Sequence, residues 1–366
     1  DRLFAGYIQG SPGQTPMKRI WLLVISLALA VALPSSSSSP NLSLRGGGFF
    51  NRMPPKKEEA PPRVPTMTDR VRAAGVLGPA AAASYSAMQI SPEWLSTELG
   101  FGLQRWQILL SGSYALFFAA NLLPGRLDTK LGRPKKEDMR FFTPAGWAFA
   151  IWGPIFLGEL LMSFWVFAPR TLAPAGAGWL REVAPYYAAA SISQALWCIS
   201  FREWALPMLW VPATLLSVSA AFMFGAHAHL ADAATGGGGA TFWGHLVFRI
   251  PATMHFGWLC AAALLSWNNH LSTIKGFSTQ MRAATCIGTC YAAAGALAWI
   301  SVQRQDGIPS LVGAWSLWAV SKGHEVLRGA VDNTLLDTVN TSAAVCAVAS
   351  LFAAAAAWIL PLLQSA

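Results

Sequence analysis

The chain has 366 residues, of which 54% are hydrophobic and only 12% are charged. An ordinary soluble domain carries about 25% charged residues, so this composition argues against a soluble protein and favours a membrane protein. The formal net charge is +9, but the Lys and Arg residues lie in the N-terminal region and in short segments between apolar blocks. This distribution suits a membrane protein, and we expect no nucleic-acid partner.

The N-terminal region is interpreted as a series of targeting segments. Residues 1–16 precede the first Met and have no pattern, so their status is unknown. Residues 17–34 combine Lys18 and Arg19 with an apolar stretch and an A-x-A site, which is typical of a signal peptide. Residues 35–63 are Ser-rich and basic, which is typical of a transit peptide. This two-part presequence predicts a membrane of an algal plastid, with the endomembrane system as the alternative.

Long apolar blocks occupy most of the chain after residue 102. They predict an all-α fold, a polytopic transmembrane helical bundle. Residues 64–102, rich in Pro and Ala, form a lead-in that we expect to be soluble and partly disordered. The block at 308–321 is short for a hydrocarbon core of about 30 Å, so the choice between seven and eight spans stays open. Helices are predicted near 103–123, 145–167, 184–202, 206–229, 243–267, 283–302, 308–321 and 341–362.

The residues that usually carry catalysis or bind metal form no recognisable pattern. We find no hydrolase or transferase motif and no paired carboxylates, and therefore expect no enzyme. The five cysteines lie inside apolar blocks, where Cys behaves as a small hydrophobe. Cys286 and Cys290 share a helix face but have no flanking His, Asp or Glu, so we predict buried structural thiols and no metal site. The other three cysteines are Cys198, Cys260 and Cys346.

Tryptophan is the most unusual feature, with 17 residues. Many lie near predicted helix ends, as expected for an interfacial belt. Trp152, Trp197 and Trp258 instead lie well inside apolar blocks, and helical spacing places each on a stripe that also carries polar groups. An ionisable group at the bilayer centre costs about 2.5–3.5 kcal/mol. The stripes should therefore face one another around an interior space, with simple helix-on-helix packing as the alternative. The stripes are Trp152, Phe156 and Glu159 on the second helix, Gln194, Trp197 and Phe201 on the third, and Pro251, His255, Trp258, Ala262 and Ser266 on the fifth.

Several sequence motifs occur on these helices in a recognisable order. Residues 143–156 read TPAGWAFAIWGPIF, similar to P-x-G-W-x-F-x-x-W, and residues 193–201 read SQALWCISF, similar to N-x-x-W-x-x-x-F. Residues 249–261 resemble R-x-P followed by Y-x-G-W-x-x-x-A, and residues 314–319 resemble a W-A-L stretch. Together they resemble the TspO/MBR (translocator protein, tryptophan-rich sensory protein) family, in the larger branch that has a C-terminal helical extension.

The resemblance implies a five-helix core over residues 103–268 and an extension over 269–366. It also implies an interior that binds porphyrins and other tetrapyrroles, sterols or related flat ligands. Three polar positions depart from the family pattern, because Gln194 and Ser266 stand where the family has Asn and His255 where it has Tyr. Ligand identity therefore stays open.

We accordingly expect a translocator- or sensor-like membrane protein that binds a flat apolar ligand between helices. Its partners would be the lipid bilayer and this ligand, and a homodimer is left open. No cofactor is required, although a tetrapyrrole could be the ligand and His255 could be an axial ligand to a metalloporphyrin. The alternatives are a pigment-associated accessory subunit of a photosynthetic complex and a secondary transporter. The expected ligand-binding residues are Trp147, Trp152, Phe156, Gln194, Trp197, Phe201, His255, Trp258 and Ala262.

Overall fold

The computed structural model describes residues 63–127, 140–167, 178–235, 245–274 and 276–364. The predicted segments 1–16 and 17–34, and all of 35–63 except Arg63, lie outside the described residues. All helices described below belong to one compact unit that begins at Met67.

All eight predicted helices are present, which confirms the helical bundle. Within the described residues, five stretches are long and apolar enough to cross a membrane: Gly146–Trp165, Trp210–Asp232, Leu246–Ser272, Thr279–Gln303 and Asn333–Gln364. The number of spans, seven or eight, stays a prediction, because α5 has only 17 residues and α13 only 15. The helices are α5 (Arg105–Asn121), η1 (Gly146–Ile151) leading into α7 (Trp152–Trp165), α8 (Gly178–Ser200), α9 (Trp210–Thr235), η3 (His245–Arg249) leading into α11 (Ile250–Ser272), α12 (Thr279–Gln303), α13 (Ile308–Lys322) and α14 (Asn333–Gln364).

The lead-in before α5 is more ordered than the sequence predicts. Met67–Gln89 forms a 23-residue helix, α3, so the expectation of a partly disordered segment is wrong there. Ala is the best helix former, and residues 80–83 of this helix are all Ala. One face of α3, with Ala73, Val76 and Ala80, packs in a buried apolar cluster with residues of α9. The other short elements that the structure describes are α4 (Pro92–Ser96), the hairpin of β1 (Glu98–Gly100) and β2 (Leu103–Gln104), η2 (Glu203–Met208) and η4 (Glu325–Leu327).

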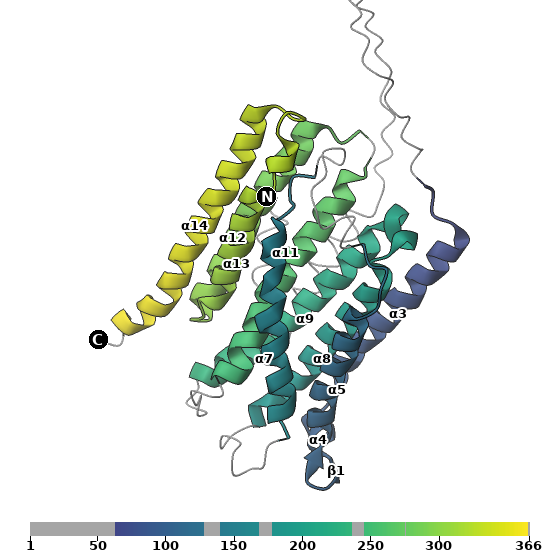
Figure 1. Ribbon diagram of the computed structural model, residues 1–366. Helices are drawn as coiled ribbons and strands as arrows, with labels where there is room; N and C mark the ends of the chain where they lie inside the picture. The colour runs from purple at the N-terminus through teal and green to yellow at the C-terminus, as the bar shows by residue number, and fades with distance from the viewer. Residues whose placement is uncertain (1–62, 128–139, 168–177, 236–244, 275, 365–366) are drawn as a thin grey trace, which may run out of the picture. The chain divides into compact units, whose positions relative to one another are not determined.

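Five helices form a closed ring (Figure 1). Going round it, α5 contacts α8, α8 contacts α9, α9 contacts α11, α11 contacts α7, and α7 contacts α5. The remaining helices α12, α13 and α14 pack on one another as a C-terminal group, which meets the ring mainly where α13 lies against α11. Residues that face the inside of the ring therefore come from segments far apart in the sequence.

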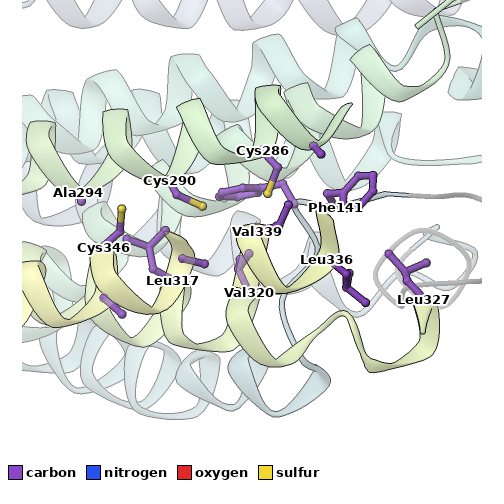
Figure 2. Packing of buried hydrophobic residues seen from close by; sticks show 14 residues of the cluster. Phe141, Cys286, Cys290, Ala294, Leu317, Val320, Leu327, Leu336, Val339 and Cys346 are labelled. Atoms are coloured by element: carbon purple, nitrogen blue, oxygen red, sulfur yellow. The ribbon is translucent and has the colours of Figure 1, made fainter. Parts of the chain in front are cut away.

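The C-terminal group has its own apolar core, shown in Figure 2. Cys286 and Cys290 of α12 and Cys346 of α14 lie in it beside Leu317 of α13, and all are buried. Phe141, from the segment before η1, belongs to the same core. The segment that leads into η1 and α7 is thus inserted into the C-terminal group.

Hydrogen bonds hold this inserted segment in place. The Ala145 backbone N–H donates to the Ala319 carbonyl over 2.8 Å, and Nε2 of His324 donates to the Phe141 carbonyl. His324 lies between α13 and α14 and is fully buried, and this burial lowers its pKa below the usual value. The segment that leads into α7 is therefore fixed by residues of the C-terminal group.

A close approach of α7 and α11 depends on a glycine. A Cβ built on Gly158 would lie 2.6 Å from Cβ of Pro251, whose ring cannot rotate away. We expect Gly158→Ala to lower the free energy of unfolding by about 1–3 kcal/mol, because overpacking forces backbone shifts. Gly153→Ala is the matched control in the same helix, since a Cβ there meets nothing within 4 Å. Unfolding titrations in detergent measure both variants, and equal stability of the two would contradict this close approach.

Candidate functional site

Three buried polar side chains meet inside the ring. Nδ1 of His255 on α11 lies 2.6 Å from Oε1 of Glu159 on α7, and Nε2 of the same ring lies 2.9 Å from Oε1 of Gln194 on α8. All three side chains are fully buried. The helical stripes that the sequence places around an interior space thus do converge there, at Glu159, Gln194 and His255.

The geometry of this cluster allows two arrangements of its protons. A carboxylate only accepts hydrogen bonds, so Nδ1 of His255 donates to Glu159. If Nε2 donates to the Gln194 oxygen, His255 is an imidazolium paired with the Glu159 carboxylate. If the Gln194 amide is reversed, its N–H donates to a neutral imidazole. In both arrangements the two ring nitrogens of His255 are occupied, so coordination of a metalloporphyrin by His255 would require Gln194 to move.

Some of the polar capacity at the cluster is unused. Among the described residues, Oε2 of Glu159 and Nε2 of Gln194 are buried and have no hydrogen-bond partner in the protein. The hydroxyl of Tyr187 on α8 lies near Glu159 and Ser191, without the geometry of a hydrogen bond. Burying such groups unpaired costs free energy, so they are suited to bind a polar group of a ligand or water.

Aromatic rings enclose the cluster on one side. Phe117 of α5 and Trp152 of α7 lie 5.6 Å and 5.5 Å from the His255 ring, centroid to centroid. Phe156 stacks on Trp152 at 5.0 Å and also contacts Phe117 at 5.6 Å. Sequence reasoning predicts Trp152 and Phe156 here but misses Phe117, although Ser113 and Tyr114 precede it by four and three residues and mark the same buried face of α5.

The other predicted site residues lie further away. Trp258 is buried and meets Trp152 edge-on at 6.2 Å, so it extends the aromatic wall. Trp147 is half-exposed and contacts Trp315 of the C-terminal group at 4.7 Å. Ala262, on the next turn after Trp258, is partly buried.

Two predicted residues belong to a different environment. Trp197 stacks on Phe201 at 5.2 Å, and the guanidinium of Arg126 lies 5.7 Å from the Trp197 ring. Trp197 also packs against the apolar cluster that includes α3. None of the described ring contacts joins either residue to His255, so they lie outside the cluster that His255 forms with Glu159 and Gln194.

A second buried polar cluster is absent from the sequence predictions. Asp306, between α12 and α13, is 1% exposed and accepts a hydrogen bond from Nε of Arg249 over 3.0 Å. The Thr253 hydroxyl donates to Asp306 over 3.5 Å, and Nδ1 of the buried His227 on α9 lies 3.1 Å from that hydroxyl. The Ile308 backbone N–H also donates to Asp306. This cluster joins the ring to the C-terminal group, and the Arg of the R-x-P motif was its only signal in the sequence.

Metal binding finds no support in the residues that the structure describes. No group of three or more His, Cys, Asp or Glu side chains among them could hold a metal ion. The described side chains inside the ring offer hydrogen bonding between Glu159, His255 and Gln194 and aromatic contact with Phe117 and Trp152.

Comparison with known proteins identifies one family. The sequence model of the family described as TSPO-like protein matches residues 107–356. The match begins in α5 and ends in α14, so it includes both the five-helix ring and the C-terminal group. No curated protein and no solved structure gives a significant match.

Proposed function

The chain belongs to the TSPO-like protein family, and from this premise we propose that it binds a flat, largely apolar ligand of the tetrapyrrole class inside the helical ring. The observation that supports the proposal is that buried polar atoms without a described hydrogen-bond partner lie beside aromatic rings. Oε2 of Glu159 and Nε2 of Gln194 lie beside a set of rings formed by Phe117, Trp152 and Phe156. A tetrapyrrole offers ring N–H donors for the carboxylate and a broad face for aromatic contact.

Binding requires the aromatic side chains to move. Phe117, Trp152 and Phe156 contact one another, with centroids 5.0–6.2 Å apart. A flat ligand would insert between these rings and exchange ring-to-ring contacts for ring-to-ligand contacts. The polar atoms of Glu159 and Gln194 would then determine the ligand specificity, because a ligand without a matching polar group leaves these atoms unpaired.

The test is a titration of the purified protein with protoporphyrin IX, followed by quenching of Trp fluorescence. We expect His255→Ala and Trp258→Ala each to weaken the affinity about tenfold or more, which corresponds to about 1.4 kcal/mol. Trp299→Ala is the control, because Trp299 lies on α12 and is exposed. Unchanged affinity in both His255→Ala and Trp258→Ala would refute this site.

We also propose that the protein is delivered to a plastid membrane, where tetrapyrroles are made. This proposal is supported by the signal-like residues 17–34 and the Ser-rich, basic residues 35–63. A fluorescent protein fused after residue 102 should enter plastids of an alga with plastids of secondary origin. Retention in the endomembrane system would contradict the proposal.

A further inference from the structure

An apolar groove lies outside the ring, where α7 and α11 meet α13 and α14. Its volume is about 540 Å³, and every residue that lines it is apolar. This volume is within the range of small-molecule sites, roughly 300–1,000 Å³. Ile151 and Val312 line the groove and pack in the same cluster as Trp258, whereas neither Glu159 nor His255 is among the described residues that line it. The groove is therefore distinct from the site proposed above.

The groove is suited to hydrocarbon. Among the described residues, no charged side chain lines it, and two lining side chains, Trp315 and Trp358, have a polar atom. The indole N–H of Trp315 is already donated to the Ala148 carbonyl over 2.9 Å. A polar group placed here would find few partners and would cost free energy to bury. The occupant should therefore be a hydrocarbon chain with its polar part elsewhere.

The groove is continuous with the lipid-facing surface. Two of the helices that border it are candidate membrane spans at the edge of the structure, since only 33% of each span is buried in α7 and α14, against 72% in α9. Leu157 and Leu161 of α7 and Leu351 of α14 are large, exposed and apolar, as lipid-facing residues are. A lipid chain can therefore enter sideways from the bilayer.

The ends of the helices indicate how such a chain would lie. Ile250 and Ile308 begin α11 and α13, and Trp358 lies near the C-terminal end of α14. These three residues lie where the groove reaches the ends of the helices. A lipid headgroup would lie there. From Ile308 to Trp315 the groove follows α13 for about 10 Å towards the middle of the bilayer.

We propose that this groove holds one acyl chain of a bilayer phospholipid. The chain enters beside the ends of α11, α13 and α14 and lies between the ring and the C-terminal group. The lipid then fills the junction between these two parts, where protein side chains alone leave space.

The experiment uses the full chain in liposomes of phosphatidylcholine that carries a photoactivatable diazirine on one acyl chain. After illumination, peptide mapping measures the yield of adducts on Met254, which lines the groove and is only partly exposed. We expect this yield to approach that of Phe164, which is 69% exposed on the outer face of α7. Ala150→Phe, which fills the groove, should lower it to the yield of the fully buried Leu259.

Two further variants keep the test decisive. Leu311→Phe is a second way to fill the groove, in case Ala150→Phe does not fold. Leu161→Phe adds the same ring on the outer face of α7, away from the groove, and should leave the Met254 yield unchanged.

Three results would overturn the proposal. The first is a Met254 yield no higher than that of Leu259 in the unmodified protein, or one that neither filling variant lowers. The second is protection of Met254 by protoporphyrin IX, which would make the groove the site of the ring ligand. The third is protection of Met254 from labelling that increases with the protein-to-lipid ratio, which would mean that a second copy of the chain covers the groove. Failure of the porphyrin titration alone leaves the acyl-chain proposal standing, so the two can be told apart.

Discussion

Asp306→Ala is expected to lower the free energy of unfolding by about 3–5 kcal/mol, the cost of removing one partner of a buried ion pair. The loss is large because Asp306 is 1% exposed and accepts hydrogen bonds from the Arg249 guanidinium, the Thr253 hydroxyl and the Ile308 backbone. Without the carboxylate, the charge of Arg249, whose side chain is 13% exposed, keeps a 3.4 Å hydrogen bond to the Gln305 carbonyl among the contacts that the structure describes.

The neighbouring pair of Asp232 and Arg304 provides the control. Its N–O distance is 2.7 Å, but Asp232 is 67% exposed, so Asp232→Ala should cost only about 0–1 kcal/mol. Unfolding by a denaturing detergent in mixed micelles, followed by circular dichroism, compares both variants with the unmodified protein. Equal losses in the two variants would show that burial of Asp306 contributes nothing to stability.

Removal of Glu159 or His255 alone is the second change with a large expected effect. Each single variant, Glu159→Leu or His255→Phe, leaves one buried partner without its charge-assisted hydrogen bond, and we expect a loss of about 3–5 kcal/mol in each case. The double variant should lose less than the sum of the two, with a coupling energy of about 1–3 kcal/mol. The ring that His255→Phe introduces would still contact Phe117, which replaces part of the lost packing.

The same variants separate stability from binding. If Glu159 and His255 hold a ligand, the double variant should bind protoporphyrin IX more weakly than the unmodified protein, even though it loses less stability than the two single variants together. Gln194→Leu is the companion variant, because it removes the other partner of the His255 ring and leaves the Glu159 contact in place. A double variant that binds the porphyrin normally would assign these residues to packing alone.

The sequence predicts the fold class, the eight helices and the family because each leaves a local pattern. Apolar blocks of sufficient length mark the spans, and fixed motif spacings mark the family. Spacing also predicts which faces of α7, α8 and α11 meet, since Glu159, Gln194 and His255 interrupt otherwise apolar helices. The structure brings these three side chains together.

The spacing of residues along a helix predicts the face of the helix on which each side chain lies. It does not predict which residues of other helices that side chain contacts. Trp197 and Phe201 follow Gln194 by one and two turns, so they lie towards the end of α8. There Trp197 contacts Arg126, Phe201 and the cluster with α3. Asp306 could not be predicted for a related reason. It lies in a short turn far from Arg249 in the sequence, and only the packing of α13 on α11 brings the two together.

The segment before η1 also has a consequence for how the chain assembles during its synthesis. Phe141 and Ala145 are synthesised early, yet their hydrogen-bond partners, His324 and Ala319, are synthesised well over one hundred residues later, 183 residues in the case of Phe141 and His324. When the five ring helices have left the ribosome, the start of α7 still lacks the contacts that fix it. These contacts can form only after α13 and His324 have been synthesised. A chain that stops after α11 should be degraded by membrane proteases faster than the full chain.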